Sequence, residues 1–147
     1  MSECPSTLQI DAGLQARLIA AARDIRVHAY APYSRFLVGA ALLDERGVIH
    51  VGCNIENAAY PLTQCAEASA IAALIASGAR RIMAVAVVGN GTGPCPPCGG
   101  CRQRLREFAR DDVNIIMAGA EGGRHEMQLG ALLPASFGPE FLTENGA

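Results

Sequence analysis

We expect the sequence to fold as an α/β protein, a three-layer α/β/α sandwich around a mixed five-stranded sheet. Three observations predict this class. Segments with helical periodicity alternate with short apolar segments, which is the pattern of helices packed on a sheet. The length of 147 residues suits one hydrophobic core. No internal repeat or low-complexity linker divides the sequence, so we expect a single domain over residues 1–147.

Three helices are predicted from apolar residues that recur every three to four positions. The first runs from Asp11, a good N-terminal cap, to about His28. The second covers the alanine-rich residues 66–77 and ends at Gly78, where glycine can adopt the left-handed conformation of a C-cap. The third covers residues 102–110.

Five strands are predicted from short runs rich in apolar and β-branched residues. The first two form a hairpin across the polar residues 44–47. The third is apolar throughout, as expected for a strand that is buried on both faces. The expected strands cover residues 38–43, 48–53, 82–88, 113–117 and 124–127, and a loop covers residues 30–36.

Composition argues against two classes of partner. The 12 basic and 14 acidic residues leave a net charge of −2, and there is no Trp, so nothing favours binding to nucleic acid. No apolar run approaches the roughly 18 residues that cross a bilayer, so we expect no membrane association. A hydrophobic content of 50% indicates apolar surface for subunit contacts. The polar N-terminus carries no apolar signal segment, which predicts a cytoplasmic protein with reduced thiols.

The most informative pattern is Cys65-Ala66-Glu67 followed by Pro97-Cys98-Gly99-Gly100-Cys101. It supplies three thiolates for a metal and one carboxylate that is not needed as a ligand. Three protein ligands leave a tetrahedral zinc ion with one open position, which is typical of catalytic zinc sites. A carboxylate two residues from a ligand can reach a water there as a proton shuttle. We therefore expect one zinc ion per chain, held by Cys65, Cys98 and Cys101, with Glu67 as the catalytic residue.

The other cysteines fit this site less well. Cys95 and Cys98 also form a CxxC pair, but the prolines between them have no amide hydrogen to donate to a thiolate. We interpret Cys53 as a small buried apolar residue at a strand end and Cys4 as a thiol in a loose tail. A rival hypothesis joins Cys95 to the other three as a closed structural zinc site without catalysis, in which Glu67 is an ordinary helix residue.

Taken together, the motifs resemble the small homotetrameric zinc-dependent cytidine deaminases, in which a non-ligand Glu follows the first ligand and a PCxxC pair lies downstream. The resemblance covers about residues 14–142 and depends on the order and spacing of several segments. These are residues 30–36 (YAPYSRF), 38–42 (VGAAL), 52–58 (GCNIENA), 65–67 (CAE), 98–103 (CGGCRQ) and 132–134 (LLP).

The resemblance implies hydrolytic deamination of cytidine and deoxycytidine in pyrimidine salvage, with ammonia as the second product. Glu67 would accept a proton from the attacking water, deliver it to ring nitrogen 3, and in a later step protonate the departing amine. Asn54 and Glu56 would bind the ribose hydroxyl, since alternate residues of an extended segment share a face. A carboxylate there suits a free sugar hydroxyl and repels a phosphodiester.

The remaining expected contacts also follow from the resemblance. Phe36 would pack on the pyrimidine ring. The amide of Ala66 would bind the pyrimidine carbonyl, and the carbonyl of Pro97 would bind the amino group. Three further substrate-site residues would approach the pocket from a neighbouring subunit of a homotetramer: Ala58, Tyr60 and Phe137.

One position departs from the family pattern. Relatives with three thiolates usually carry Arg directly after the glutamate, where it donates to a metal-bound sulfur, but here that residue is Ala68. Arg102 and Arg104 are possible substitutes. Blasticidin S deaminases also lack this arginine, so deamination of a modified cytidine or of an aminopyrimidine antibiotic is an alternative function. A non-catalytic structural zinc protein is a further alternative.

Overall fold

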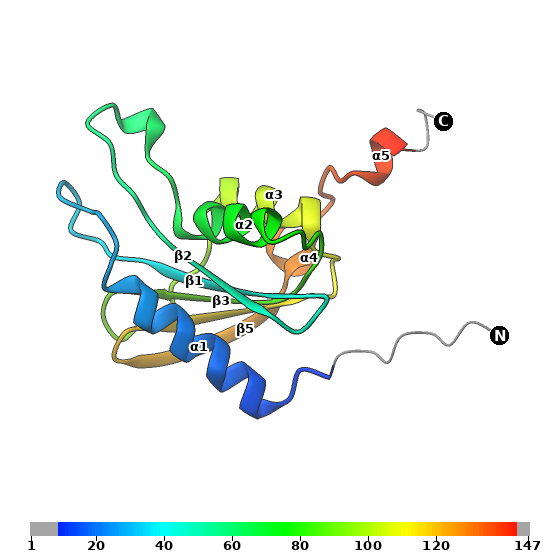
Figure 1. The fold of residues 1–147 in the computed structure, drawn as a ribbon, viewed down its shortest axis with the longest axis horizontal. Coiled ribbons are helices and arrows are strands. Elements are labelled where there is room, and N and C mark those ends of the chain that lie inside the picture. Colours follow the sequence, from blue (N-terminus) through cyan, green and yellow to red (C-terminus); the bar gives the residue numbers. More distant parts are fainter. Residues whose placement is uncertain (1–8, 144–147) are drawn as a thin grey trace.

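Five strands form one mixed sheet within residues 9–143, which are the residues that the computed structural model describes (Figure 1). The strands are β1 (Gly39–Asp44), β2 (Ile49–Cys53), β3 (Ile82–Gly89), β4 (Asn114–Gly119) and β5 (Gly122–Gln128). Their order in the sheet is β2-β1-β3-β4-β5, with β3 and β4 parallel and the other neighbours antiparallel. The predicted mixed five-stranded sheet is confirmed.

Helices cover both faces of this sheet and so complete three layers (Figure 1). α1 (Ala12–Arg26) packs on one face, while α2 (Ala66–Ala76) and α3 (Gly99–Phe108) pack together on the other. Short helices are η1 (Tyr60–Leu62), α4 (Leu129–Leu132) and α5 (Glu140–Thr143). In the described part of the chain, no helix is both long and apolar enough to cross a membrane.

The central strands are apolar because their alternate side chains enter two different cores. In β1, Ala40 and Leu42 belong to the core beneath α2 and α3, whereas Ala41 and Leu43 belong to the core beneath α1. β3 divides its side chains in the same way. This two-sided burial explains the continuous apolar run predicted for the third strand.

Two glycines allow helices to lie very close to the sheet. A Cβ atom on Gly39 would lie 1.9 Å from the carbonyl oxygen of Ala22 in α1. A Cβ atom on Gly52 would lie 2.3 Å from the amide nitrogen of Ala70 in α2. Side chains at these positions would push the helices away. Gly52 matters for the site below, because α2 carries two of the predicted site residues at its start.

The third helix differs most from its expected range. We expected residues 102–110 after a glycine turn, but α3 begins three residues earlier, with Cys98 as its N-cap. Gly99 and Gly100 are poor helix formers, and this weak propensity suggested a turn. Burial of Cys101 and of the following apolar face outweighs it. Cys101 therefore lies inside the first turn of the helix and not before it.

The other two helices match their expected signals closely. The carboxylate of Asp11 accepts a hydrogen bond from the Leu14 amide at 2.8 Å, so Asp11 caps α1 as predicted. α1 ends at Arg26, two residues before the expected end. Gly78 follows the end of α2 with a φ of +94°, which confirms the predicted left-handed residue.

Candidate active site

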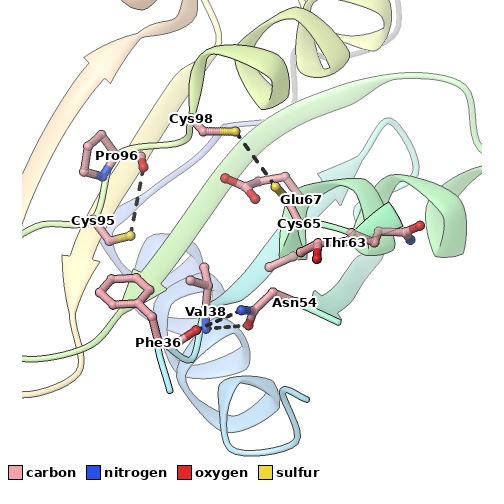
Figure 2. A pocket seen from close by; sticks show the side chains of 11 residues that line it. Phe36, Val38, Asn54, Thr63, Cys65, Glu67, Cys95, Pro96 and Cys98 are labelled. Atoms are coloured by element: carbon pink, nitrogen blue, oxygen red, sulfur yellow. Dashed lines mark hydrogen bonds between the residues drawn. The ribbon is translucent and has the colours of Figure 1, made fainter. Parts of the chain in front are cut away.

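The N-termini of α2 and α3 lie next to each other, and each helix has a cysteine as its N-cap (Figure 2). Cys65 is the N-cap of α2, and Cys98 is the N-cap of α3. Figure 2 shows their thiols close to the carboxylate of Glu67. The first amides of a helix have no carbonyl partner within that helix, so two such ends together favour negative charge.

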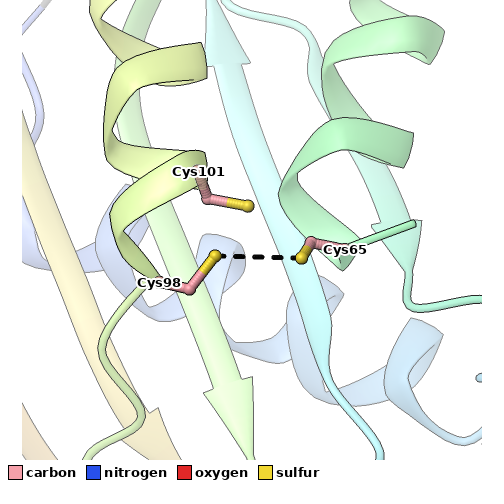
Figure 3. A group of neighbouring side chains, drawn as sticks. All are labelled: Cys65, Cys98 and Cys101. Atoms are coloured by element: carbon pink, nitrogen blue, oxygen red, sulfur yellow. Dashed lines mark hydrogen bonds between the residues drawn. The ribbon is translucent and has the colours of Figure 1, made fainter. Parts of the chain in front are cut away.

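Three sulfur atoms meet here and form what we call the sulfur cluster: the Sγ atoms of Cys65, Cys98 and Cys101 (Figure 3). All lie within 4.8 Å of one another, and those of Cys65 and Cys98 are 3.9 Å apart. Zn–S bonds of about 2.3 Å in a tetrahedral site place neighbouring sulfurs about 3.8 Å apart. The donor type and the spacing therefore fit a zinc ion with three thiolate ligands.

The surroundings of the sulfur cluster determine how its thiols ionise. Burial raises the pKa of the Cys65 and Cys101 thiols above the ordinary value. Burial also acts on Cys98, but hydrogen bonds from the Cys101 amide and with the other two thiols outweigh it and lower the pKa of Cys98. The Cys65 and Cys101 thiols therefore hold their protons more tightly than ordinary cysteines do. Metal binding at this cluster must release protons.

Glu67 lies in the first turn of α2 and is only 4% exposed. Burial raises the pKa of its carboxyl group, while its own amide, Cys101 and the charge of Arg104 offset part of that rise. A raised pKa makes the carboxyl group a better proton acceptor than an ordinary glutamate. Its position beside three sulfurs suits proton transfer at a metal centre.

A cavity of about 210 Å³ opens next to the sulfur cluster (Figure 2). Of the residues predicted to contact substrate, Phe36, Asn54 and Ala66 line this cavity together with Glu67. The amide group of Asn54 accepts a hydrogen bond from the Val38 amide and donates one to the Phe36 carbonyl, both at 2.8 Å. Asn54 therefore fixes the backbone that carries the Phe36 ring.

Glu56 lines a neighbouring cavity of about 470 Å³ and not the one beside the sulfur cluster. Its carboxylate accepts hydrogen bonds from the amides of Tyr33, at 2.8 Å, and Ser34. Asn54 and Glu56 thus line different cavities, although the chain between them stays extended beyond β2 through β-bridges from Ile55 to Tyr30 and Gln64. Their common role at the ribose stays a prediction. Thr63 borders both cavities, so the two adjoin.

Four other predicted substrate residues do not line the cavity beside the sulfur cluster, although one of them, Tyr60, lines the neighbouring cavity with Glu56. Pro97 is buried, and its carbonyl accepts a hydrogen bond from Arg102 Nε at 2.9 Å. Ala58 is exposed, Tyr60 is 71% exposed, and Phe137 is 58% exposed. The role of these last three in a neighbouring subunit's pocket stays a prediction.

Five residues that the motifs did not single out for substrate binding also line the cavity: Val38, Thr63, Gln64, Cys95 and Pro96. Three of them could have been found from sequence, because Thr63 and Gln64 precede Cys65 directly and Pro96 precedes the PCxxC segment. Val38 begins the 38–42 segment of the resemblance, but that segment indicated a strand and not a place in the cavity. Val38 directly precedes β1, at the end of the loop that carries Phe36, and this position brings it to the wall of the cavity.

Cys95 does not belong to the sulfur cluster, which in the described residues consists of three cysteines. Its thiol contacts the Pro96 carbonyl at 3.9 Å, and a Cβ on Gly89 would lie 2.7 Å from its sulfur. The geometry therefore does not support the rival hypothesis of a closed four-sulfur site, which requires the sulfur of Cys95 in the cluster. Cys53 is half-buried at the end of β2, not fully buried. Cys4 lies outside the described residues.

Ala68, where relatives were expected to carry arginine, lines a groove between α2 and α3 and not the cavity. Its small side chain therefore leaves space in that groove. The small side chain of Ala68 adds no space to the cavity beside the sulfur cluster, where the substituted amino group of a modified cytidine would have to fit.

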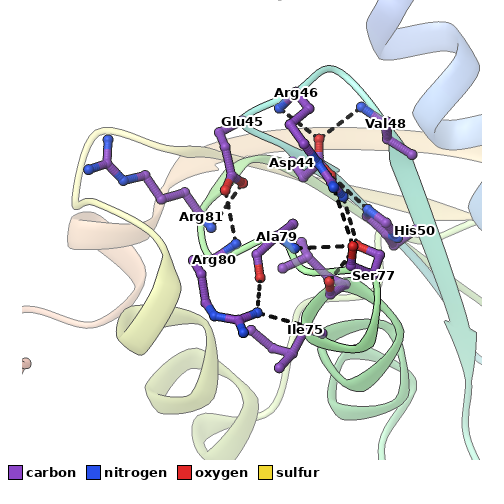
Figure 4. A network of polar contacts seen from close by, with 11 residues as sticks. Asp44, Glu45, Arg46, Val48, His50, Ile75, Ser77, Ala79, Arg80 and Arg81 are labelled. Carbon is purple, nitrogen blue, oxygen red and sulfur yellow. Dashed lines mark hydrogen bonds and ion pairs between the residues drawn. The ribbon is translucent and has the colours of Figure 1, made fainter.

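The far end of α2 is held by a buried carboxylate (Figure 4). Asp44 is 0% exposed and accepts hydrogen bonds from the amides of Arg46 and Val48 and from the side chains of Arg46 and His50. Despite burial, these contacts hold the pKa of Asp44 well below its ordinary value. Arg46 also donates to the Ser77 hydroxyl at 2.7 Å, which ties the β1–β2 turn to the C-cap of α2.

A three-thiolate cluster beside a buried carboxylate, between two helix starts on a mixed sheet, defines the class of zinc-dependent hydrolases. Comparison with known proteins agrees and is more specific. Residues 14–117 match the family model described as the cytidine and deoxycytidylate deaminase zinc-binding region. The chain belongs to this family.

Its relatives match over most of their length. The chain is 44% identical over 127 residues to cytidine deaminase from Sporosarcina psychrophila, covering 86% of this chain and 93% of that protein. It is 42% identical to cytidine deaminase from Halalkalibacterium halodurans, covering 86% and 96% respectively. A crystal structure of cytidine deaminase from Burkholderia pseudomallei aligns with a TM-score of 0.79 at 43% identity, covering 83% of this chain and 98% of that one.

Proposed function

We propose that this protein is a zinc-dependent cytidine deaminase, which hydrolyses cytidine and deoxycytidine to uridine and deoxyuridine and releases ammonia. The observation that carries the proposal is a cluster of three cysteine sulfurs, to which residues 9–143 supply no fourth ligand, beside the buried Glu67. The activity named for its relatives supports the same substrate. We place the reaction in pyrimidine salvage in the cytoplasm, where thiols stay reduced.

Cys65, Cys98 and Cys101 would hold one zinc ion per chain. Sulfur donors suit zinc, and the helix ends that carry Cys65 and Cys98 favour the negative charge of thiolates. When bound, zinc supplies Lewis acidity that lowers the pKa of a water from 15.7 to about 7.

Glu67 performs the proton transfers of the proposed reaction. Its carboxylate accepts a proton from the water that attacks ring carbon 4 and delivers it to ring nitrogen 3. The carboxylate then takes the proton of the new hydroxyl group on carbon 4 and passes it to the amino group, the carbon–nitrogen bond breaks as the carbon–oxygen double bond forms, and ammonia leaves. Burial raises the pKa of Glu67, which matches a group that must be base and acid in turn.

Other residues would orient the nucleoside. Phe36 forms an apolar wall for the pyrimidine ring, and the amide of Ala66, at the first position of α2, is free of helical pairing and can bind the ring carbonyl. Asn54 and, from the adjoining cavity, Glu56 would bind the ribose hydroxyl. The Pro97 carbonyl has a second lone pair for the amino group, beside the one that Arg102 occupies.

We further propose a homotetramer in which neighbouring subunits complete each pocket with Ala58, Tyr60 and Phe137. Large apolar side chains are exposed on the two loops that extend beyond the sheet in Figure 1, including Tyr33 and Tyr60. Near the C-terminus, the exposed rings of Phe137 and Phe141 stack with centroids 5.3 Å apart. Such surfaces are typical of subunit contacts.

The test is to incubate zinc-loaded protein separately with cytidine, deoxycytidine and blasticidin S while following ultraviolet absorbance. We expect turnover of both nucleosides and its loss after zinc is removed by a chelator. Turnover of blasticidin S alone would replace the proposal with antibiotic deamination. A protein that holds one zinc ion and deaminates none of the three would overturn the proposed function.

A further inference from the structure

The proposed metal centre has an uncompensated charge. A zinc ion with three thiolates carries a net charge of −1, and an ionised Glu67 beside it adds another. Much of this charge is buried, since Cys101 is 0% exposed and Glu67 is 4% exposed. Buried charge that is neither paired nor hydrogen-bonded is strongly destabilising. A cation close to the sulfurs would therefore stabilise the metal-bound state.

Arg104 is the cation that reaches the sulfur cluster. Its Nη1 atom lies 4.0 Å from the Sγ atom of Cys101, three residues earlier on the same face of α3. Among the ion pairs of the described residues, none involves Arg104. Its charge also acts on Glu67 and opposes the rise in the pKa of that carboxyl group. Arg102 is nearer to the cysteines in sequence, but its guanidinium donates to the carbonyls of Pro97 and Leu132.

The groove between α2 and α3 accommodates this guanidinium. Ala68 of α2 and Arg104 of α3 line the same groove, which has a volume of about 660 Å³. A large side chain at position 68 would compete with Arg104 for that space. Gly100 lies beneath the guanidinium, since a Cβ atom there would be 3.4 Å from Arg104 Nη1. Ala68 on α2 and Gly100 on α3 therefore leave space for the Arg104 side chain to reach the sulfur of Cys101.

We propose that Arg104 is a positioning residue of the metal centre, which donates to the sulfur of Cys101 and supplies the compensating charge from α3. This inference rests on the proposed zinc site and names a residue that tunes it. The arginine expected after Glu67 on α2 is replaced, in this chain, by an arginine on the opposite wall of the same groove.

The test compares Arg104→Gln, Arg104→Lys and a matched control, Arg110→Gln, which removes an exposed arginine that pairs with Asp112 just beyond α3. Zinc affinity is measured by competition with a chromogenic chelator. We expect Arg104→Gln to bind zinc about 10-fold more weakly, in line with the loss of an outer hydrogen-bond partner, while Arg104→Lys retains most of the affinity. Thermal unfolding confirms that each variant folds.

A spectroscopic readout separates electrostatic tuning from a merely structural role. In the cobalt(II)-loaded protein, loss of a donor to sulfur raises the energy of the thiolate electrons, so the sulfur-to-cobalt charge-transfer band should move to longer wavelength in Arg104→Gln. The double variant Arg104→Ala with Ala68→Arg should return the band and the zinc affinity toward those of the parent, because a guanidinium then enters the groove from α2.

Unchanged affinity and an unchanged band in Arg104→Gln would overturn the inference, as would equal losses in Arg110→Gln. These outcomes leave the proposed function standing if the parent protein binds zinc and deaminates cytidine. A parent protein that binds neither zinc nor cobalt at the sulfur cluster would overturn the inference and the proposed function together.

Discussion

Two buried carboxylates in residues 9–143 have opposite environments and therefore different roles. Asp44 is surrounded by donors from Arg46, Val48 and His50, which hold its pKa well below the ordinary value despite its burial. Glu67 has no ion pair in this part of the chain, and burial raises its pKa. A satisfied carboxylate stabilises the fold, whereas an unpaired one is available for proton transfer.

Replacing Glu67 with Gln should keep the shape of the site and remove its proton shuttle. We expect zinc content to stay near one ion per chain, because Glu67 is not a proposed ligand, and turnover to fall about a thousandfold or more. Metal analysis and the ultraviolet assay measure the two effects. Glu121→Gln, at an exposed turn between β4 and β5, serves as the control. Near-normal turnover in zinc-loaded Glu67→Gln would contradict the role of Glu67.

Replacing Asp44 with Asn should destabilise the fold without touching the site. The variant removes a buried charge and leaves donors unpaired, so we expect the free energy of unfolding to fall by about 3 kcal/mol in urea denaturation at neutral pH. Asp112→Asn, an exposed member of an ion pair, should change it by less than about 1 kcal/mol. An equal, small effect of both substitutions would show that the Asp44 network is not stabilising.

The same network predicts a pH dependence. Because folding lowers the pKa of Asp44 below its ordinary value of 3.8, its stabilisation is complete above that value and is lost as the pH falls through the folded-state pKa. The stability difference between the parent and Asp44→Asn should therefore shrink below about pH 4. A difference that stays constant from neutral to acid pH would contradict this assignment.

Among the secondary-structure elements, α2 matters most for the site, because it carries Cys65 and Glu67 at its start and is fixed to the sheet along its length. Gly52 allows its backbone to lie against β2, and the contact between Arg46 and Ser77 holds its far end. The first turn of α2 therefore keeps a defined position opposite the first turn of α3, where the other two cysteines lie.

Adding a methyl group to β2 should disturb this placement. In Gly52→Ala the new Cβ would lie 2.3 Å from the Ala70 amide nitrogen, so α2 must move away from the sheet. We expect a loss of about 2 kcal/mol of stability together with weaker zinc binding, measured by denaturation and by chelator competition. Gly93→Ala, where a Cβ would meet nothing within 4 Å, is the matched control. Unchanged zinc binding in a folded Gly52→Ala protein would contradict the coupling.

Sequence patterns predicted which helices and strands exist more accurately than the residues at which they begin and end. Apolar periodicity and the cap at Asp11 located α1, and the continuous apolar run located β3, because these signals arise from burial that the chain itself encodes. The start of α3 was missed because Gly99 and Gly100 have weak helix propensity, and only tertiary packing of Cys101 extends the helix across them.

At the scale of the whole molecule, the proposed site divides into a part that one chain builds and a part that we propose a neighbouring subunit completes. The cysteines and Glu67 converge because short motifs lie at two helix starts, which the sequence indicates directly. The placement of Glu56 beside a separate cavity depends on how two loops fold against each other, and spacing alone could not show it. Tyr60 and Phe137 stay exposed in the single chain.

Mixed oligomers test whether subunits share their active sites. Phe137→Ala should lower activity by removing a ring from the neighbouring pocket, while Glu67→Gln is inactive but keeps that ring. When the two variants are refolded together, some pockets have an intact Glu67 and an intact neighbouring Phe137, so activity should exceed the sum of the separate variants. Size-exclusion chromatography with light scattering checks for a tetramer. Activity no greater than that sum, in a verified mixed oligomer, would contradict shared sites.

The account depends most on a metal with three sulfur ligands and a fourth position left for water. X-ray absorption spectroscopy at the zinc edge of the loaded protein tests this directly. We predict three sulfur atoms at about 2.3 Å and one oxygen or nitrogen atom at about 2.0 Å. Four sulfur atoms around the zinc, or none, would contradict the account.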